Sequence, residues 1–330
     1  MQKKSGEIAL MEWLNTHYGI IATSLVHLPL GADRNASVYK AQTSGGKSYF
    51  VKLKRGYHSN ISVTLLDFLQ ASGIQQIISP IKTVDGKLMQ HTSHCTIIVY
   101  PFIQGQDGFC CPLTEDQWIV LGQTLKQVHE LDLPPSLKDQ IRKETYTSCW
   151  SEVLPFLDGM EKNVAEDAAA LKLLAFMKKH QSVLHRLVSQ TQQLHQSLQK
   201  KPAEFVLCHS DIHAGNVLID ESCAIYIVDW DEPILAPKER DLMFMGAGVA
   251  NVWNQPREEA LFYQGYGNTN IDKPLLAYYR HERILQDIIE YCHALLLTSD
   301  GGKERCEMYK QFVDMFEPSG VIDITFKTKA

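Results

Sequence analysis

The hydrophobic and polar positions of the first hundred residues alternate between helical and strand-like spacing. An opening segment places apolar residues three positions apart, as one face of a short helix requires: Ile8, Met11 and Leu14. Three extended stretches follow, at residues 24–30, 37–42 and 48–53. Because glycine-containing turn signals separate these stretches, we expect an antiparallel meander.

A helix and two further strands are expected next. Residues 61–69 carry apolar side chains at helical spacing, and Gly73 stands where a left-handed residue would end such a helix. Two strands should then flank a hairpin signal at Asp85-Gly86, the second of them at residues 96–100. The pattern therefore predicts five strands and one inserted helix before residue 101.

Helical spacing dominates after Pro101. Thr114 and Gln117 form a capping-box signature before a long apolar-faced helix, and helical periodicity returns at residues 152–200. A small hairpin interrupts the helices, with strand-like residues at 205–208, 217–219 and 224–228. We therefore expect an α+β chain whose first part is mainly sheet and whose second part is mainly helical.

Composition favours a folded chain of two lobes. The length of 330 residues exceeds that of a typical domain, and 45% apolar with 21% charged residues is an ordinary globular balance. A net charge of -6 without clustered Lys and Arg argues against a nucleic-acid partner. Eight cysteines lack disulfide or metal spacing, and Glu7 and Glu12 interrupt the N-terminal apolar stretch. We expect a cytoplasmic protein with no membrane partner.

The segment that carries chemistry runs from His209 to Asn216 and is followed by Asp229. Phosphoryl transfer needs a carboxylate that orients the attacking hydroxyl and accepts its proton, and oxygen ligands for Mg²⁺. Asp211 suits the first role, and Asn216 and Asp229 suit the second. The His-x-Asp-x-x-x-x-Asn pattern of His209, Asp211 and Asn216 arises by accident with on the order of one chance in a hundred, and the following strand with Asp229 lowers that chance further. For His213 two interpretations stay open, a contact to phosphates or substrate and a hydrogen-bonded loop histidine.

These motifs resemble the catalytic and metal-binding signature of aminoglycoside phosphotransferases and choline-kinase-like enzymes. The resemblance extends along essentially the whole chain, since Val128-His129 and Arg240-Asp241-Leu242 also look like motifs of that family. Four segments look most like the spectinomycin phosphotransferases, the aminoglycoside 9-phosphotransferase branch: residues 52–57, 99–103, 209–217 and 229–254.

The resemblance implies a bilobal protein-kinase-like fold. Its N-terminal nucleotide-binding lobe would span residues 1–100, with a five-stranded antiparallel sheet and one inserted helix. A hinge at 101–104 would lead to a mainly helical catalytic and substrate-binding lobe at 105–330, with a helical subdomain at about 112–200. ATP and Mg²⁺ are the implied cofactors, and we expect a monomer.

Several residue roles follow from the resemblance alone. Lys52 would be the strand lysine that contacts the α- and β-phosphates of ATP. A phosphate-covering loop would be formed by Gly31, Asp33 and Asn35. The hinge would offer adenine the backbone groups of Pro101 and Ile103.

The inserted helix departs from the family pattern. Kinases pair the strand lysine with a glutamate from this helix, whereas residues 58–66 contain no acid. Three alternatives stay open for Lys52: a hydrogen bond donated to Asn60, an ion pair with Asp67, or contact with the nucleotide alone.

The region after Asp229 bears on the acceptor. Only eleven residues separate Asp229 from Asp241, too few for the activation segment with which a protein kinase binds a peptide. Acidic residues gather here instead and could form a negative pocket for a cationic aminocyclitol: Asp231, Glu232, Glu239 and Asp241.

Of these acids, Asp231 and Glu232 are best placed to meet a ligand amine. Asp241 and His209 are expected to support the catalytic loop. Trp230 and Tyr266 are expected to line a site for the sugar ring. The expected activity is ATP-dependent phosphorylation of a hydroxyl of spectinomycin or a related antibiotic, which inactivates it. The alternative acceptor is another small metabolite, such as a choline- or homoserine-like alcohol.

Overall fold

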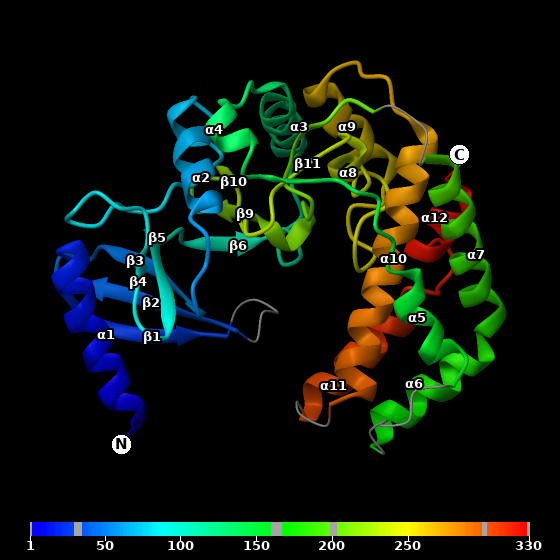
Figure 1. Ribbon diagram of the computed structural model, residues 1–330, viewed down its shortest axis with the longest axis horizontal. Helices are drawn as coiled ribbons and strands as arrows, with labels where there is room; N and C mark the ends of the chain where they lie inside the picture. Colours follow the sequence, from blue (N-terminus) through cyan, green and yellow to red (C-terminus); the bar gives the residue numbers. More distant parts are fainter. Residues whose placement is uncertain (1, 30–34, 160–166, 199–202, 299–301, 329–330) are drawn as a thin grey trace. The chain divides into compact units, whose positions relative to one another are not determined.

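The computed structural model describes residues 2–29, 35–159, 167–198, 203–298 and 302–328 (Figure 1). The chain divides into two compact units. Unit 1 comprises Met1–Pro112, Asp132–Ile141 and Gly215–Pro233. Unit 2 comprises Leu113–Leu131, Arg142–Ala214 and Ile234–Ala330. The predicted bounds of two lobes and a hinge stay a prediction.

Unit 1 contains the predicted five-stranded antiparallel sheet, in the order β1-β2-β3-β5-β4. Its strands are β1 Ala22–Leu28, β2 Ala36–Thr43, β3 Ser48–Arg55, β4 Gln90–His91 and β5 Cys95–Pro101. Helix α1 Gln2–Tyr18 precedes the sheet, and α2 Ile61–Ala71 is inserted between β3 and β4 (Figure 1). The α+β prediction is thereby confirmed.

The core of this sheet corrects the predicted face of the first helix. Leu10 and Leu14 of α1 are buried against residues of the central strands such as Val51 and Val99. Ile8, which the spacing placed on the buried face, is exposed. The apolar face of α1 therefore begins two residues later than predicted.

The turn at Asp85-Gly86 forms, but it does not join two strands. Thr83 N donates to Lys87 O over 2.8 Å, and Gly86 has a φ of +83° as such a turn requires. Strands β4 and β5 both follow this turn and pair with each other. The strand predicted before Asp85 is absent from the described residues, because a single backbone hydrogen bond from Ile81 to Val99 replaces a ladder.

A second, three-stranded sheet belongs to unit 1, in the order β10-β9-β6. Its strands are β6 Gly105–Asp107, β9 Val217–Asp220 and β10 Ile225–Ile227. The predicted hairpin joins β9 to β10, and its turn uses the Asp220 carboxylate as acceptor for the backbone of Ser222 and Ala224. The short helix α4 Pro135–Lys138 also belongs to this unit.

Unit 2 is mainly helical, as predicted. Its helices are α3 Glu115–Glu130, α5 Trp150–Leu157, α6 Ala168–Lys179, α7 Gln181–Leu198, α8 Glu239–Leu242, α9 Pro256–Tyr266, α10 Lys273–Leu296, α11 Gly302–Asp314 and α12 Val321–Lys327. The small sheet β7-β11-β8 consists of β7 Arg142–Lys143, β11 Ile234–Ala236 and β8 Val206–Cys208. Within the described ranges, no helix has the length and apolar character that crossing a bilayer requires.

Helices α3 and α9 approach each other through two glycines. A Cβ atom at Gly122 would lie 2.1 Å from Phe262 O, and one at Gly265 would lie 1.9 Å from Ile119 O. The predicted capping box at Thr114 and Gln117 starts α3. This close approach brings the C-terminal end of α3, where His129 lies, beside Tyr266 at the end of α9.

We predict that Gly122→Ala destabilises the protein by about 1–3 kcal/mol, because the added methyl forces two backbones apart. Thermal and urea unfolding would measure the loss. Gly6→Ala in α1 is the matched control, since its Cβ meets nothing within 4 Å and alanine favours a helix. Equal unfolding midpoints for the two variants would contradict the prediction.

Candidate active site

The side chain of Lys52 lies among carboxylates in unit 1. Its Nζ is 2.7 Å from Asp231 Oδ2 and 3.0 Å from Asp229 Oδ1, and the side chain is only 15% exposed. Lys54, two residues along β3 and therefore on the same face of the strand, lies 3.0 Å from Asp231 Oδ2. One carboxylate oxygen of Asp231 thus bridges two strand lysines.

The charges of this group stabilise one another. Burial lowers the pKa of Lys52, but the two aspartates outweigh it and raise that pKa above its ordinary value. Burial likewise works against Asp231, and the two lysines nevertheless hold its pKa below the usual range. Lys52 and Asp231 therefore stay charged at neutral pH.

This arrangement answers what replaces the glutamate of the inserted helix. Asp67, one of the predicted alternatives, instead pairs with Lys82 at 3.1 Å and accepts a hydrogen bond from Ser79. Asn60 precedes α2. Lys52 takes its partners from the segment after β10, 177 and 179 residues further along the chain.

The two predicted metal ligands are brought together by the β9–β10 hairpin. Val228 N donates to Asn216 O over 2.9 Å, which places Asn216 opposite the residue that precedes Asp229. Asp229 has a φ of +64°, uncommon for a residue with a side chain, and its side chain is 49% exposed. An amide and a carboxylate oxygen are hard donors, so this pair fits Mg²⁺.

The structure describes only some of the other residues that were predicted to contact the nucleotide. Gly31 and Asp33 lie outside the described residues. Asn35 is exposed, and its carbonyl accepts a hydrogen bond from Arg55 N at the end of β3. Pro101 ends β5 and is exposed, and Ile103 is half-buried two residues later. Their contacts to a nucleotide stay a prediction.

In unit 2, Asp211 lies beside a cation that the sequence did not indicate. Its Oδ1 accepts a hydrogen bond from Arg283 Nη1 of α10, and its Oδ2 is 3.5 Å from His213 Nε2. The side chain is 44% exposed. Burial alone would raise the pKa of Asp211, but the hydrogen bond from His213 and the charge of Arg283 hold it well below its usual range.

The loop that carries Asp211 is fixed by the buried carboxylate of Asp241. His209 N donates to Asp241 Oδ2 over 2.9 Å, and Ser210 N donates to Oδ1 over 2.6 Å. His129 Nε2 lies 3.1 Å from Oδ2. The backbone of Ser210 has a φ of +77°, a strained conformation that these contacts maintain.

His209 itself lies under the loop. It is almost fully buried, and its Nδ1 lies 3.2 Å from Asp211 N, which donates to it. This geometry matches the supporting role predicted for His209 and Asp241. Sequence reasoning missed His129 as a member of the group.

Three of the four predicted substrate residues are buried or paired with other side chains, and the fourth is exposed. Asp231 is paired with Lys52 and Lys54, as described above. Trp230 is buried and its indole N–H donates to Ile227 O, while Tyr266 is buried with its hydroxyl 2.7 Å from His129. Glu232 is exposed.

Two of the four acids after the predicted metal ligand Asp229 are buried in unit 2. Glu239 is buried and accepts a hydrogen bond from Asp272 N. Asp241 is fully buried and binds the loop backbone. Packing and backbone hydrogen bonds account for these two, and the lysines of β3 account for Asp231.

Comparison with known proteins decides the family. The family model of the phosphotransferase enzyme family matches residues 27–295. The chain belongs to the phosphotransferase enzyme family. The predicted family resemblance is thereby confirmed, and this phosphotransferase is a small-molecule kinase.

Solved structures agree along nearly the whole phosphotransferase chain. Spectinomycin phosphotransferase APH(9)-Ia in complex with ADP and spectinomycin is 46% identical, over 97% of this chain and 98% of that chain, with a TM-score of 0.90. The AMP-bound complex of the same enzyme is 44% identical over 98% and 99% of the two chains, with a TM-score of 0.87.

More distant structures share the fold alone. Choline kinase LicA from Streptococcus pneumoniae is 17% identical over 94% of this chain and 98% of that chain, with a TM-score of 0.55. Comparison with curated protein sequences returns no match. The likeness to the solved structures establishes the kinase-like α+β fold of the phosphotransferase.

The contacts of Asp231 give a prediction that separates its two possible roles. If Asp231 positions Lys52, Asp231→Asn should lower kcat about tenfold or more, because the strand lysines lose their shared counter-charge. The KM of the acceptor should stay within about twofold. Steady-state kinetics with MgATP would measure both constants.

Asp67→Asn is the matched control, since Asp67 is the acid of the inserted helix and pairs with Lys82 instead. Its kcat should stay close to that of the unmodified enzyme. An Asp231 variant that raises only the KM of the acceptor would instead support the direct substrate contact predicted from the sequence.

Proposed function

We propose that this phosphotransferase transfers the γ-phosphoryl group of ATP, with Mg²⁺, to a hydroxyl of spectinomycin or a closely related aminocyclitol antibiotic and thereby inactivates it. The observation that carries the proposal is the 46% identity over 97% of the chain to an enzyme solved with ADP and spectinomycin. We further propose that it works in the cytoplasm and as a monomer.

The proposed nucleotide-binding residues lie in unit 1. Lys52, held by Asp231, would bind the α- and β-phosphates, and Lys54 shares the same carboxylate. Asn216 and Asp229 would hold Mg²⁺, which neutralises charge on the phosphates when bound. The contact between Lys52 and Asp229 places a positive charge beside the proposed metal-binding carboxylate.

The proposed base lies in unit 2. Asp211 would accept a hydrogen bond from the acceptor hydroxyl and turn its oxygen toward the γ-phosphorus. The new phosphorus–oxygen bond forms as the bond to the β-phosphate oxygen breaks, ADP leaves with that electron pair, and the hydroxyl proton passes to Asp211. Only four residues, 212–215, separate Asp211 from the proposed metal ligand Asn216 along the chain.

A strongly ionised carboxylate suits this role. A base with a depressed pKa is a weak proton acceptor, so it acts first by orienting the hydroxyl. Its proton affinity matters only late, when bonding to phosphorus has made the acceptor oxygen acidic. The low pKa of Asp211 therefore fits a residue that first orients the acceptor hydroxyl.

The substrate prediction is tested by incubating the protein with MgATP and single acceptors and measuring product mass. The panel contains spectinomycin, streptomycin, kanamycin, choline and homoserine. We expect one phosphate on spectinomycin and none on choline or homoserine. Turnover of a metabolite without turnover of any antibiotic would replace the proposed acceptor and leave the family and the roles of Asp211, Asn216 and Asp229 in place.

The role of Asp211 gives a second prediction. Asp211→Asn should lower kcat about a hundredfold or more, because the hydroxyl loses both its orienting acceptor and its base. Affinity for MgATP, measured by calorimetry, should change less than about threefold. Asp158→Asn, at a surface carboxylate of unit 2, is the control and should leave both quantities unchanged. A large loss of nucleotide affinity in the Asp211 variant would show that the assignment of roles is wrong.

A further inference from the structure

Arg283 is the cation nearest to the proposed base among the described contacts of unit 2. It lies on α10, which starts 62 residues after Asp211, and its side chain is 20% exposed. Its Nη1 donates to Asp211 Oδ1, and its Nε lies 2.9 Å from Asp287 Oδ1, four residues further along the same helix. One guanidinium thus connects the proposed base to a second carboxylate.

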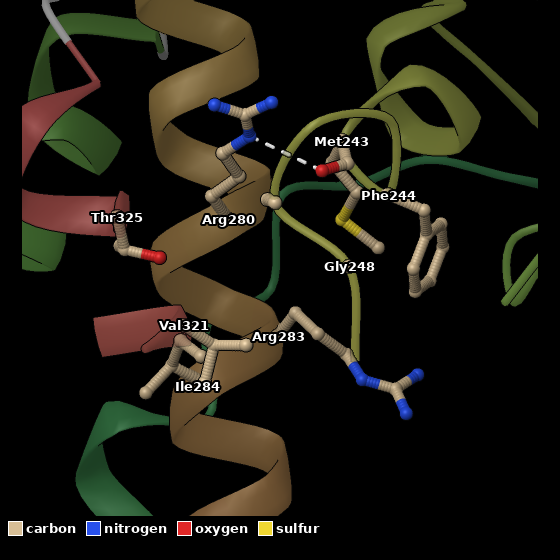
Figure 2. A pocket seen from close by; sticks show the side chains of 9 residues that line it. Met243, Phe244, Gly248, Arg280, Arg283, Ile284, Val321 and Thr325 are labelled. Carbon is tan, nitrogen blue, oxygen red and sulfur yellow. Dashed lines mark hydrogen bonds between the residues drawn. The ribbon is translucent and has the colours of Figure 1, made fainter. Parts of the chain in front are cut away.

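The guanidinium is held from a third side by an aromatic ring. Its central carbon lies 5.5 Å from the centroid of the buried Phe244 ring, within the range of a cation–π contact. Figure 2 shows Arg283 extending from α10 past the loop that carries Met243, Phe244 and Gly248. Arg280, one turn earlier, instead donates to the Met243 carbonyl of that loop.

We propose that Arg283 is a positioning residue of the transfer reaction, which fixes the carboxylate of Asp211 and is itself held in place by Asp287. The inference rests on the proposed function, since that function makes Asp211 the base. It adds two residues for which the motifs of the sequence gave no indication.

The geometry explains why a planar, forked cation is needed here. Arginine presents several N–H donors in fixed directions, so Nη1 can donate to Asp211 while the same guanidinium forms an ion pair with Asp287. A lysine supplies the charge on a single nitrogen, without the separate donors of the guanidinium.

The charges around Asp211 also set its ionisation. His213 faces it from its own loop, Arg283 and Asp287 face it from α10, and Glu290 adds a further negative charge near Arg283. Without the guanidinium, burial would act on Asp211 with only His213 to oppose it. The pKa of Asp211 should then rise, and the base should become protonated at a higher pH.

The kinetic test compares Arg283→Gln, Arg283→Lys and Asp287→Asn with the unmodified enzyme, using MgATP and the acceptor that the panel identifies. We expect Arg283→Gln to lower kcat about ten- to hundredfold, with the KM of MgATP within about twofold. Arg283→Lys should recover part of the loss because it restores the charge. Asp287→Asn should lower kcat by a smaller factor, since Arg283 keeps its contact with Asp211.

The pH profile separates positioning from a general loss of structure. In Arg283→Gln the acid limb of kcat/KM should move to higher pH by at least about one unit, because Asp211 loses its neighbouring cation. Arg257→Gln is the matched control, because Arg257 forms an ion pair with Glu115 on the surface of unit 2 and is 75% exposed. Its kcat and pH profile should equal those of the unmodified enzyme.

A second measurement needs no turnover and therefore tests the inference even if none of the acceptors is phosphorylated. Carboxyl ¹³C NMR, with the Asp211 signal assigned by its loss in Asp211→Asn, should show a higher Asp211 pKa in Arg283→Gln than in the unmodified protein. Thermal unfolding confirms that each variant is folded, and the uncharged Arg283→Met replaces Arg283→Gln if that variant is not. An unchanged Asp211 pKa, or a kcat equal to that of the unmodified enzyme, would overturn the proposal.

Discussion

The buried carboxylate of Asp241 is the constraint on which the catalytic loop depends. It is fully buried and receives the backbone N–H groups of His209 and Ser210, with His129 at its other side. A buried charge is tolerated only when hydrogen bonds replace its water. These bonds also hold Ser210 in its strained conformation. If the loop relaxed, the buried carboxylate of Asp241 would lose its hydrogen-bond donors. The contacts of Asp241 therefore also determine how the loop presents the side chain of Asp211.

Each unit balances its reactive carboxylates with a cation from a regular element. In unit 1 the lysines of β3 neutralise Asp229 and Asp231, and in unit 2 Arg283 of α10 neutralises Asp211 and Asp287. Strands and helices fix the position of a side chain better than loops do. The carboxylates that carry the proposed chemistry lie on loops and hairpin ends, and their partners on rigid elements limit how far they can move.

Local patterns predicted most of the fold. Capping residues, turn glycines and apolar spacing are set by neighbours in the chain, so the helix at Thr114 and the β9–β10 hairpin could be predicted from the sequence. The partners of the charged residues could not, because they come from distant segments. Asp231 reaches Lys52 across 179 residues, and Arg283 reaches Asp211 across 72. Proximity in sequence also placed Glu239 in a group of acids that could form a negative pocket, whereas packing buries its side chain.

The position of Asp231 explains how a kinase-like sheet can work without an acid at the usual place on the inserted helix. In the structure, Lys52 contacts both Asp229 and Asp231. A cation held by Asp229, as proposed, would compete with Lys52 for that carboxylate. Asp231 would then remain as the partner of the lysine, and its second contact with Lys54 anchors it to the same strand. The inserted helix then does not need to supply a partner for Lys52. This fits the absence of acids in residues 58–66 and the ion pair of Asp67 with Lys82.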